Sequence, residues 1–118
     1  MSDMPDSRRR PPTSPELNRL RAEIDELDRR IVSLLNERAE LTRAVWHEKV
    51  AIGRRAIRDR EREREVLLRV SIANAGPLSQ VDLLAIYRRL IASARALETA
   101  ERERLQRDAD EAPEPPSA

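Results

Sequence analysis

The chain has 118 residues, one domain or less, and its 23 Lys and Arg against 22 Asp and Glu leave a net charge of +1. Nucleic-acid-binding proteins normally show a clear basic excess or a one-sided basic face, so this balance argues against a nucleic-acid partner. Cysteine is absent and His47 is the only histidine. Disulfides, thiolate catalysis and zinc-thiolate sites are therefore excluded, and neither a metal nor a cofactor is expected.

Composition also indicates the fold class and the compartment. Aromatic residues make up 2% of the chain and phenylalanine is absent, so the core has to be aliphatic, which suits an all-α protein. No apolar run approaches the ~20 residues of a membrane span. The N-terminal stretch MSDMPDSRRRPP has no hydrophobic segment for export. We expect no membrane contact and a cytoplasmic location.

The first predicted helix organises the chain. Residues 1–13 are polar and proline-bearing and should form a disordered arm. Ser14 then offers an N-cap hydroxyl, Pro15 suits the first helical position, and Gly53 offers the C-cap. Between them aliphatic residues alternate at intervals of three and four, the heptad seam of a helix that packs along its whole length. This seam comprises Leu20, Ile24, Leu27, Ile31, Leu34, Leu41, Val45 and Ile52.

Two charged residues, Arg38 and Glu48, interrupt the seam, and a charge at such a position costs stability unless something pairs with it. Lys49, the only lysine, lies about 20° round the helix from Arg38 and roughly 16 Å along it. Two long cationic side chains that lean together at this spacing leave a gap suited to a small dianion. The alternative is that both snorkel from the edge of a packed seam.

Two shorter helices should follow. The second is expected over residues 57–74, with an inward face of Asp59, Glu63, Val66, Leu67 and Val70. The third opens at Ser79, with Asp82 three residues on as in a capping box. The helical domain should span residues 14–107, and the acidic, proline-rich residues 108–118 should be a disordered tail.

The lengths of these helices predict a dimer. A helix of ~38 residues is about 57 Å long, whereas a compact domain of this size is nearer 30 Å across. A partner chain most simply covers the exposed seam, so we expect an intertwined homodimer. Arg21 flanks the seam ~42 Å from Lys49. It can therefore contact a ligand at Lys49 only in the partner's site; otherwise it is an exposed arginine on the flank of a helix.

The sequence resembles the all-helical AroQ class of chorismate mutases over roughly residues 17–103. The resemblance lies in LRAEIDELDRRIVSLLNERAEL, then Lys49, then RDREREREVLL, and in a third helix whose apolar run ends near Glu98. The matching positions, in order, are Arg21, Arg38, Lys49, Asp59, Arg62, Glu63 and Glu98. It implies a dimer of three-helix chains with two sites. Each site would rearrange chorismate to prephenate by an intramolecular Claisen shift, in the shikimate pathway of aromatic amino acid biosynthesis.

The resemblance also implies a role for each residue. Arg38 would hold one substrate carboxylate, while Lys49 and Glu98 would bond the ether oxygen. Glu98 can donate to that oxygen only when protonated, so the rate should decline as the pH rises and Glu98→Gln should flatten the decline.

For substrate binding, the resemblance implies that Arg21 reaches the second carboxylate from the other subunit, and that Asp59, Arg62 and Glu63 lie around the ring hydroxyl. The sequence departs from the family pattern elsewhere. Ala94 stands where serine is frequent, with Ser93 adjacent, and Ala56 replaces a usual proline. Trp46 stands where small residues are common, and it would narrow the pocket or cover the dimer seam.

Three other functions remain open. Mutases of 4-amino-4-deoxychorismate and isochorismate-pyruvate lyases share the fold and the arginine and lysine constellation. Asp59 and Glu63 are hydrogen-bond acceptors that favour chorismate, although carboxylates also suit a 4-amino group. From another class, the chain would be a helical dimerisation adaptor without catalysis.

Overall fold

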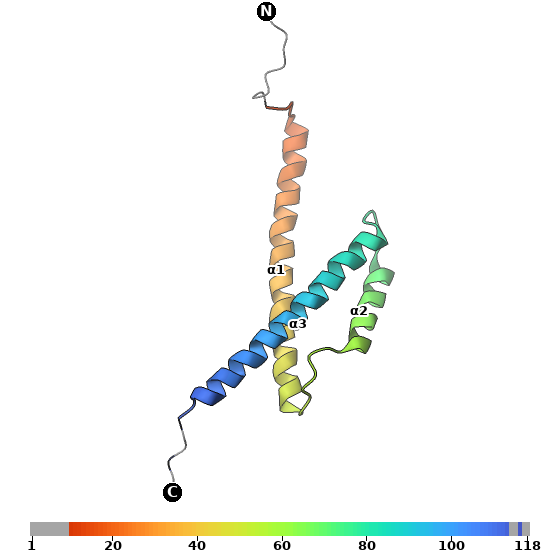
Figure 1. Cartoon of the computed structure of the whole chain (residues 1–118). Helices are drawn as coiled ribbons and strands as arrows, with labels where there is room; N and C mark the ends of the chain where they lie inside the picture. Colours follow the sequence, from red (N-terminus) through yellow and green to blue (C-terminus); the bar gives the residue numbers. More distant parts are fainter. Residues whose placement is uncertain (1–9, 114–115, 117–118) are drawn as a thin grey trace, which may run out of the picture. The chain divides into compact units, whose positions relative to one another are not determined.

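The computed structural model describes residues 10–113 and 116, and all regular secondary structure in these residues is helical. Helix α1 spans Pro15–Ala51, α2 spans Arg60–Ala73 and α3 spans Gln80–Glu111 (Figure 1). The expected all-α chain of three helices is confirmed. The chain divides into two compact units, Met1–Asn36 and Glu37–Ala118, and the division falls within α1. The second unit thus contains the end of α1 together with α2 and α3.

Both ends of α1 are formed by the residues that the sequence indicated. The backbone N–H of Leu17 donates to Ser14 Oγ at 3.0 Å, which confirms Ser14 as the N-cap. At the other end Gly53 has φ +79°, its N–H donates to the Val50 carbonyl at 3.1 Å, and the Arg54 N–H donates to the Lys49 carbonyl at 2.8 Å. These two bonds form a Schellman motif, which requires a left-handed residue that glycine supplies without strain.

In the first unit, α1 presents its seam to solvent. Leu20, Ile24, Leu27, Ile31 and Leu34 are 43–60% exposed. On the polar side of the same stretch, ion pairs form within the helix, such as that between Arg29 and Glu26. A row of aliphatic side chains in water contributes nothing to stability until another surface covers it.

Helix α2 begins three residues later than predicted. Asp59 has the extended backbone of an N-cap (φ −118°, ψ 94°), and its carboxylate accepts from the Arg62 N–H at 3.0 Å. An aspartate at this position satisfies a free N–H of the first turn, and it therefore ends the connection rather than lying inside the helix. The predicted helical start at Ile57 is wrong, and residues 57–59 belong to the connection.

Helix α3 begins as predicted but ends later. Ser79 is its N-cap and accepts from the Asp82 N–H at 3.2 Å. The helix has 32 residues, so it is only a little shorter than α1, and residues 108–111 are helical rather than part of a disordered tail. Arg104 pairs with Asp108 at 3.3 Å and Gln106 with Asp110 at 3.1 Å, both four residues apart, which extends the helix into the acidic stretch. Of the predicted N-terminal arm, residues 10–13 have no regular secondary structure; the remainder of the arm, together with residues 114–115 and 117–118, lies outside the described residues.

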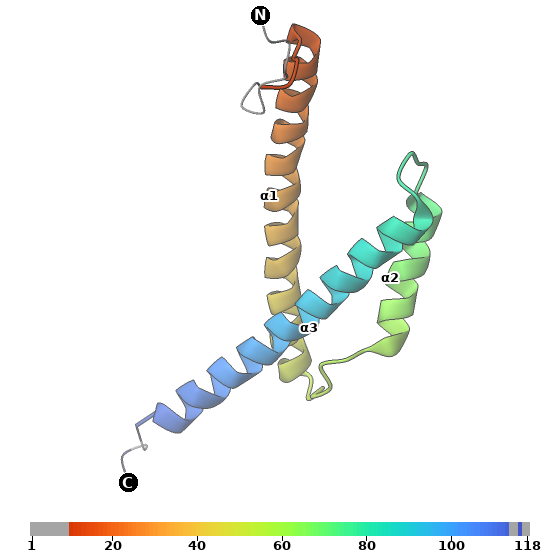
Figure 2. The same cartoon turned by 45° about the horizontal axis from the view of Figure 1, so that its top comes forward.

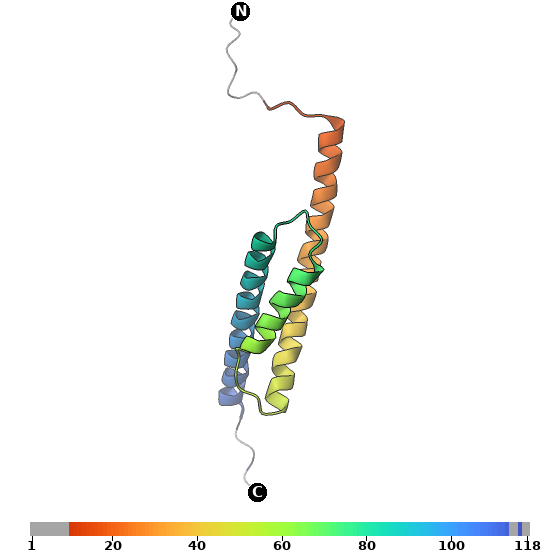
Figure 3. The same ribbon diagram turned by 90° about the vertical axis from the view of Figure 1, so that its right-hand side faces the viewer.

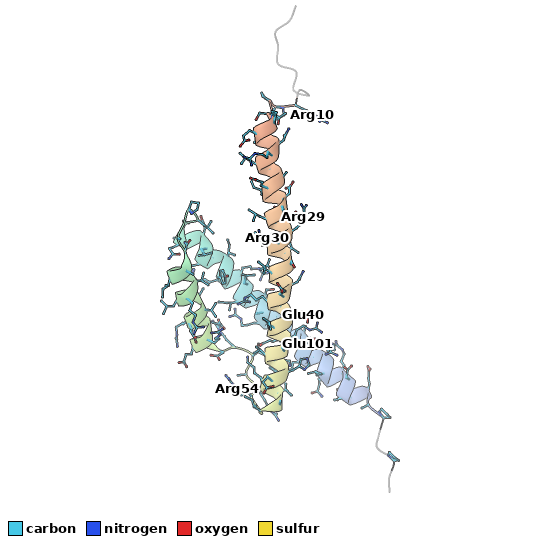
Figure 4. All side chains as sticks on the ribbon, turned by 180° about the vertical axis from the view of Figure 1, so that it is seen from behind. Arg10, Arg29, Arg30, Glu40, Arg54 and Glu101 are labelled. Atoms are coloured by element: carbon cyan, nitrogen blue, oxygen red, sulfur yellow. The ribbon has the colours of Figure 1, made fainter. Side chains whose placement is uncertain are left out.

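In the second unit α2 packs against α3, and the two are joined by a short turn around Gly76 (Figures 2 and 3). The end of α1 contacts α3 through the ion pairs Arg43–Glu101 and Lys49–Glu98, and Trp46 on the same part of α1 is 3% exposed. Glu101 of α3 is 5% exposed and lies where α3 passes α1 (Figure 4). The Glu101 carboxylate accepts a hydrogen bond from Arg104 at 2.8 Å and contacts Arg43 at 3.0 Å. The hydrogen bond from Arg104 has the largest effect on the Glu101 pKa, and together with the one from Arg43 it lowers that pKa to about 2.

Along the described part of the chain, none of the helices has an apolar stretch long enough to cross a membrane.

Candidate active site

A pocket of about 570 Å³ lies within the second unit, between the end of α1, the connection to α2, the first turns of α2 and the middle of α3. This volume is in the range of small-molecule sites. Six of the seven predicted site residues line it: Arg38, Lys49, Asp59, Arg62, Glu63 and Glu98. The seventh, Arg21, belongs to the first unit and is exposed.

The wall between α1 and α3 carries a buried ion pair. Lys49 is 8% exposed and Glu98 is 6% exposed. The Lys49 Nζ lies 3.4 Å from both Glu98 carboxylate oxygens and 3.3 Å from the Ile57 carbonyl oxygen. Three acceptors therefore hold the ammonium in place at the pocket wall, which is the arrangement needed to direct a fixed positive charge at a bound ligand.

Arg38 is a cation of the pocket whose side chain has no ion-pair partner among residues 10–113. It is half-buried on α1, and its guanidinium makes no hydrogen bond or ion pair with any residue from 10 to 113. Its backbone carbonyl accepts from the Thr42 hydroxyl at 3.1 Å. A half-buried guanidinium with five free donors is suited to bidentate binding of a carboxylate.

The first turn of α2 forms an acidic end of the pocket, which we define as Asp59 and Glu63. The Asp59 carboxylate accepts from the Arg62 backbone N–H, and Arg54 Nη2 lies 3.3 Å away. The hydrogen bond from the Arg62 backbone has the largest effect and lowers the pKa of Asp59, and the hydrogen bond from Arg54 lowers it further. Glu63 Oε1 accepts from Arg95 Nη1 at 2.6 Å, and Glu63 Oε2 lies 3.5 Å from Arg58 Nε. Both carboxylates of the acidic end therefore have arginine partners.

Residues 20–99 match the family model of chorismate mutase type II, which covers more than half of the chain. The chain belongs to this family. It is 38% identical over 87 residues to a bifunctional chorismate mutase/prephenate dehydratase of Aquifex aeolicus (strain VF5), and 36% identical over 87 residues to one of Stutzerimonas stutzeri. Each alignment covers 70% of this chain and 24% of the relative, so the chain spans about a quarter of the length of these curated relatives.

The pocket lining bears on two positions where the sequence departs from the family pattern. Ala94 lines the pocket and Ser93 does not, so this turn of α3 contributes no serine hydroxyl to the lining. Trp46 does not line the pocket either. It is 3% exposed on α1, and its indole N–H has no hydrogen-bond partner among the described residues.

Sequence reasoning missed two arginines of the pocket, Arg54 and Arg95. Arg95 lies three residues before Glu98, so helical spacing alone would have placed it on the same face of the third helix. Arg54 follows the C-cap of α1 in an irregular connection, where no periodicity indicates direction. With these two, the pocket lining contains five cations, Arg38, Lys49, Arg54, Arg62 and Arg95, and four carboxylates, Glu48, Asp59, Glu63 and Glu98.

The arrangement favours binding and orientation of an anion over covalent chemistry. The only hydroxyl in the lining, that of Thr42, is engaged with a backbone carbonyl. Among residues 10–113 and 116, no group of three or more His, Asp or Glu is placed to hold a metal ion. Counting partners among residues 10–113, the pocket offers one guanidinium without a partner, one buried ammonium and a set of fixed carboxylate acceptors.

Proposed function

We propose that the chain is a chorismate mutase, an isomerase that rearranges chorismate to prephenate. The observation that carries the proposal is the convergence of Arg38, the Lys49–Glu98 pair and the acidic end on one pocket, in a member of the chorismate mutase type II family. The curated relatives are described as mutases with a second, dehydratase activity, and residues 20–99, which match the family model, include the whole pocket lining.

The reaction needs a compact conformer of a dianion rather than a nucleophile or a cofactor. Arg38 binds one substrate carboxylate bidentately and so selects the conformer in which the two reacting carbons are close. In the transition state the breaking C–O bond leaves negative charge on the ether oxygen. The Lys49 ammonium, already held by three acceptors, stabilises this charge without having to reorganise.

Glu98 lies against the same ammonium and, together with Lys49, acts at the ether oxygen. The acidic end, Asp59 and Glu63, accepts the hydrogen bond of the ring hydroxyl, and Arg62 lies beside it in the lining. This assignment is supported by matching the hydrogen-bond donors of the substrate to the acceptors of the pocket. The hydroxyl is the only donor among the polar groups of the substrate, and carboxylates are its natural acceptors.

A homodimer is part of the proposal. The exposed aliphatic row from Leu20 to Leu34 supports it, because covering that row with a second copy removes a large apolar surface from water. Arg21 lies on the same stretch of α1 and, in such a dimer, supplies the second carboxylate ligand to the partner's pocket. A cytoplasmic location also belongs to this proposal, and cell fractionation tests it.

The test is loss of chorismate absorbance on addition of the purified protein, with the products identified by chromatography. Wild type should form prephenate, and Arg38→Ala should not. Arg29→Ala is the matched control, because Arg29 lies on the same helix and is exposed, with only a surface pair to Glu26. Equal turnover by Arg38→Ala and Arg29→Ala would refute the proposed site, and no product from wild type would refute the proposed activity.

A further inference from the structure

The carboxylate of Glu63 is unusually well supplied with cations. Its side chain is 18% exposed, Arg95 Nη1 lies 2.6 Å from one oxygen, and Arg58 Nε lies 3.5 Å from the other. Arg95 comes from α3 and lines the pocket together with Glu63, whereas Arg58 belongs to the connection and is not in the lining. The ion pair of Arg95 with Glu63 therefore forms part of the surface that a ligand meets.

The ion pair between Arg95 and Glu63 affects which hydrogen-bond donor of a ligand, a hydroxyl or an ammonium, the acidic end can accept. A carboxylate oxygen that accepts one hydrogen bond has a second lone pair, so Glu63 still accepts a neutral hydroxyl. A cationic ammonium at the same place would lie close to the Arg95 guanidinium, because both would contact one carboxylate. Like charges at such separations repel, and the repulsion is larger at a poorly hydrated site. The neighbouring Asp59 is compensated in the same way by Arg54.

We propose that Arg95 determines substrate specificity: through its ion pair with Glu63, it makes the acidic end of the pocket select a ring hydroxyl over a ring ammonium. The inference rests on the proposed function, since it takes chorismate as the hydroxyl-bearing substrate. The rejected class is chorismate with an amine in place of the ring hydroxyl, which is 4-amino-4-deoxychorismate. Arg95 thus acts by exclusion of the wrong substrate as well as by alignment of the acceptor for the right one.

The test compares kcat/KM for chorismate with kcat/KM for 4-amino-4-deoxychorismate. Arg95→Met keeps the length of the side chain and removes the charge, so the ratio of the two constants should fall by roughly ten-fold or more as Glu63 loses the nearer of its two arginine partners and accepts an ammonium more readily. Arg95→Lys retains a positive charge and should keep most of the preference. Arg102→Met, a change at an exposed position on the same helix, should leave the ratio unchanged.

A second variant separates specificity from damage to the fold. In Glu63→Gln the carboxylate is absent, so adding Arg95→Met to it should change the ratio much less than it does in wild type. A ratio unmoved by Arg95→Met, or an equal fall in Arg95→Lys and Arg95→Met, would overturn the inference while leaving the proposed function intact. Turnover of neither substrate by wild type would overturn the proposed function and this inference with it.

Discussion

Replacing Lys49 by methionine should destabilise the protein and abolish turnover, and a second replacement at Glu98 should restore only the stability. In the structure both side chains are almost completely buried, at 8% and 6% exposure, and the pair is 3.4 Å apart. Methionine has nearly the shape of the lysine stem, so the substitution removes the charge and leaves the packing in place. What remains is a buried carboxylate without its cation.

The size of the effect follows from that geometry. At 3.4 Å and an effective dielectric constant of about 20, the attraction between the two charges is about 5 kcal/mol. Breaking a buried pair by removing one partner typically costs about 3–5 kcal/mol. Because 3.4 Å is longer than the ~2.8 Å of a tight charged hydrogen bond, we expect the lower end, about 3 kcal/mol. This is a large part of the ~5–15 kcal/mol by which a domain is stable.

The assay is urea unfolding followed by circular dichroism, with chorismate turnover measured on the same samples. With urea m-values of about 1–3 kcal/mol/M, Lys49→Met should lower the unfolding midpoint by about 1–3 M urea. The double variant Lys49→Met/Glu98→Met should recover most of this loss, since two apolar side chains replace the pair, yet it should remain inactive because no ammonium faces the ether oxygen. Arg29→Met breaks an exposed pair with Glu26 and should cost no more than about 1 kcal/mol.

Two results would refute this reasoning. A double variant as unstable as Lys49→Met alone would mean that the unpaired Glu98 carboxylate is not the source of the cost. Full turnover by Lys49→Met would mean that the buried ammonium has no part in catalysis, and the site would have to be sought elsewhere.

Three further predictions follow from single residues. Glu98→Gln should retain turnover, because its amide N–H donates to the ether oxygen as the proposed role requires; loss of turnover in this variant would remove Glu98 from that role. Glu101 has its pKa lowered to about 2, so its ion pairs stabilise the fold fully above pH ~4.5 and progressively less down to pH 2. Glu101→Gln should therefore be less stable than wild type at pH 7, and the two unfolding midpoints should converge near pH 2. Arg38→Leu replaces a charge in the seam of α1 by an apolar side chain, so it should abolish turnover while leaving the proposed dimer at least as stable by sedimentation; retained turnover would favour a role for α1 in dimerisation alone.

The ends of the helices were predictable wherever one residue and its near neighbours decide them. Ser14 and Ser79 cap helices because their hydroxyls reach an N–H three residues on, and Gly53 ends α1 because it adopts φ +79° without strain. Asp59 was misjudged because its spacing from Glu63 fits a helical face as well as a cap. At that position the capping hydrogen bond to the Arg62 N–H prevailed over continuation of the helix.

Membership of the site was also largely predictable, but the pairing inside it was not. The sequence indicated Arg38 and Lys49 from their helical spacing, and Glu98 from the family resemblance alone. It contained no sign that Glu98 would bury itself against Lys49, or that Glu63 would be shared by two arginines.

The sequence by itself determined three helices, two of their N-caps, one C-cap and the charged interruptions of the first seam, because these depend on contacts within about four residues. The tertiary structure alone decided the pairs Lys49–Glu98, Glu63–Arg95 and Arg43–Glu101, whose partners are 49, 32 and 58 residues apart. Such pairs depend on the rotation and register with which α3 lies against α1 and α2. No local pattern specifies these quantities, since they result from how all the side chains of the second unit pack together.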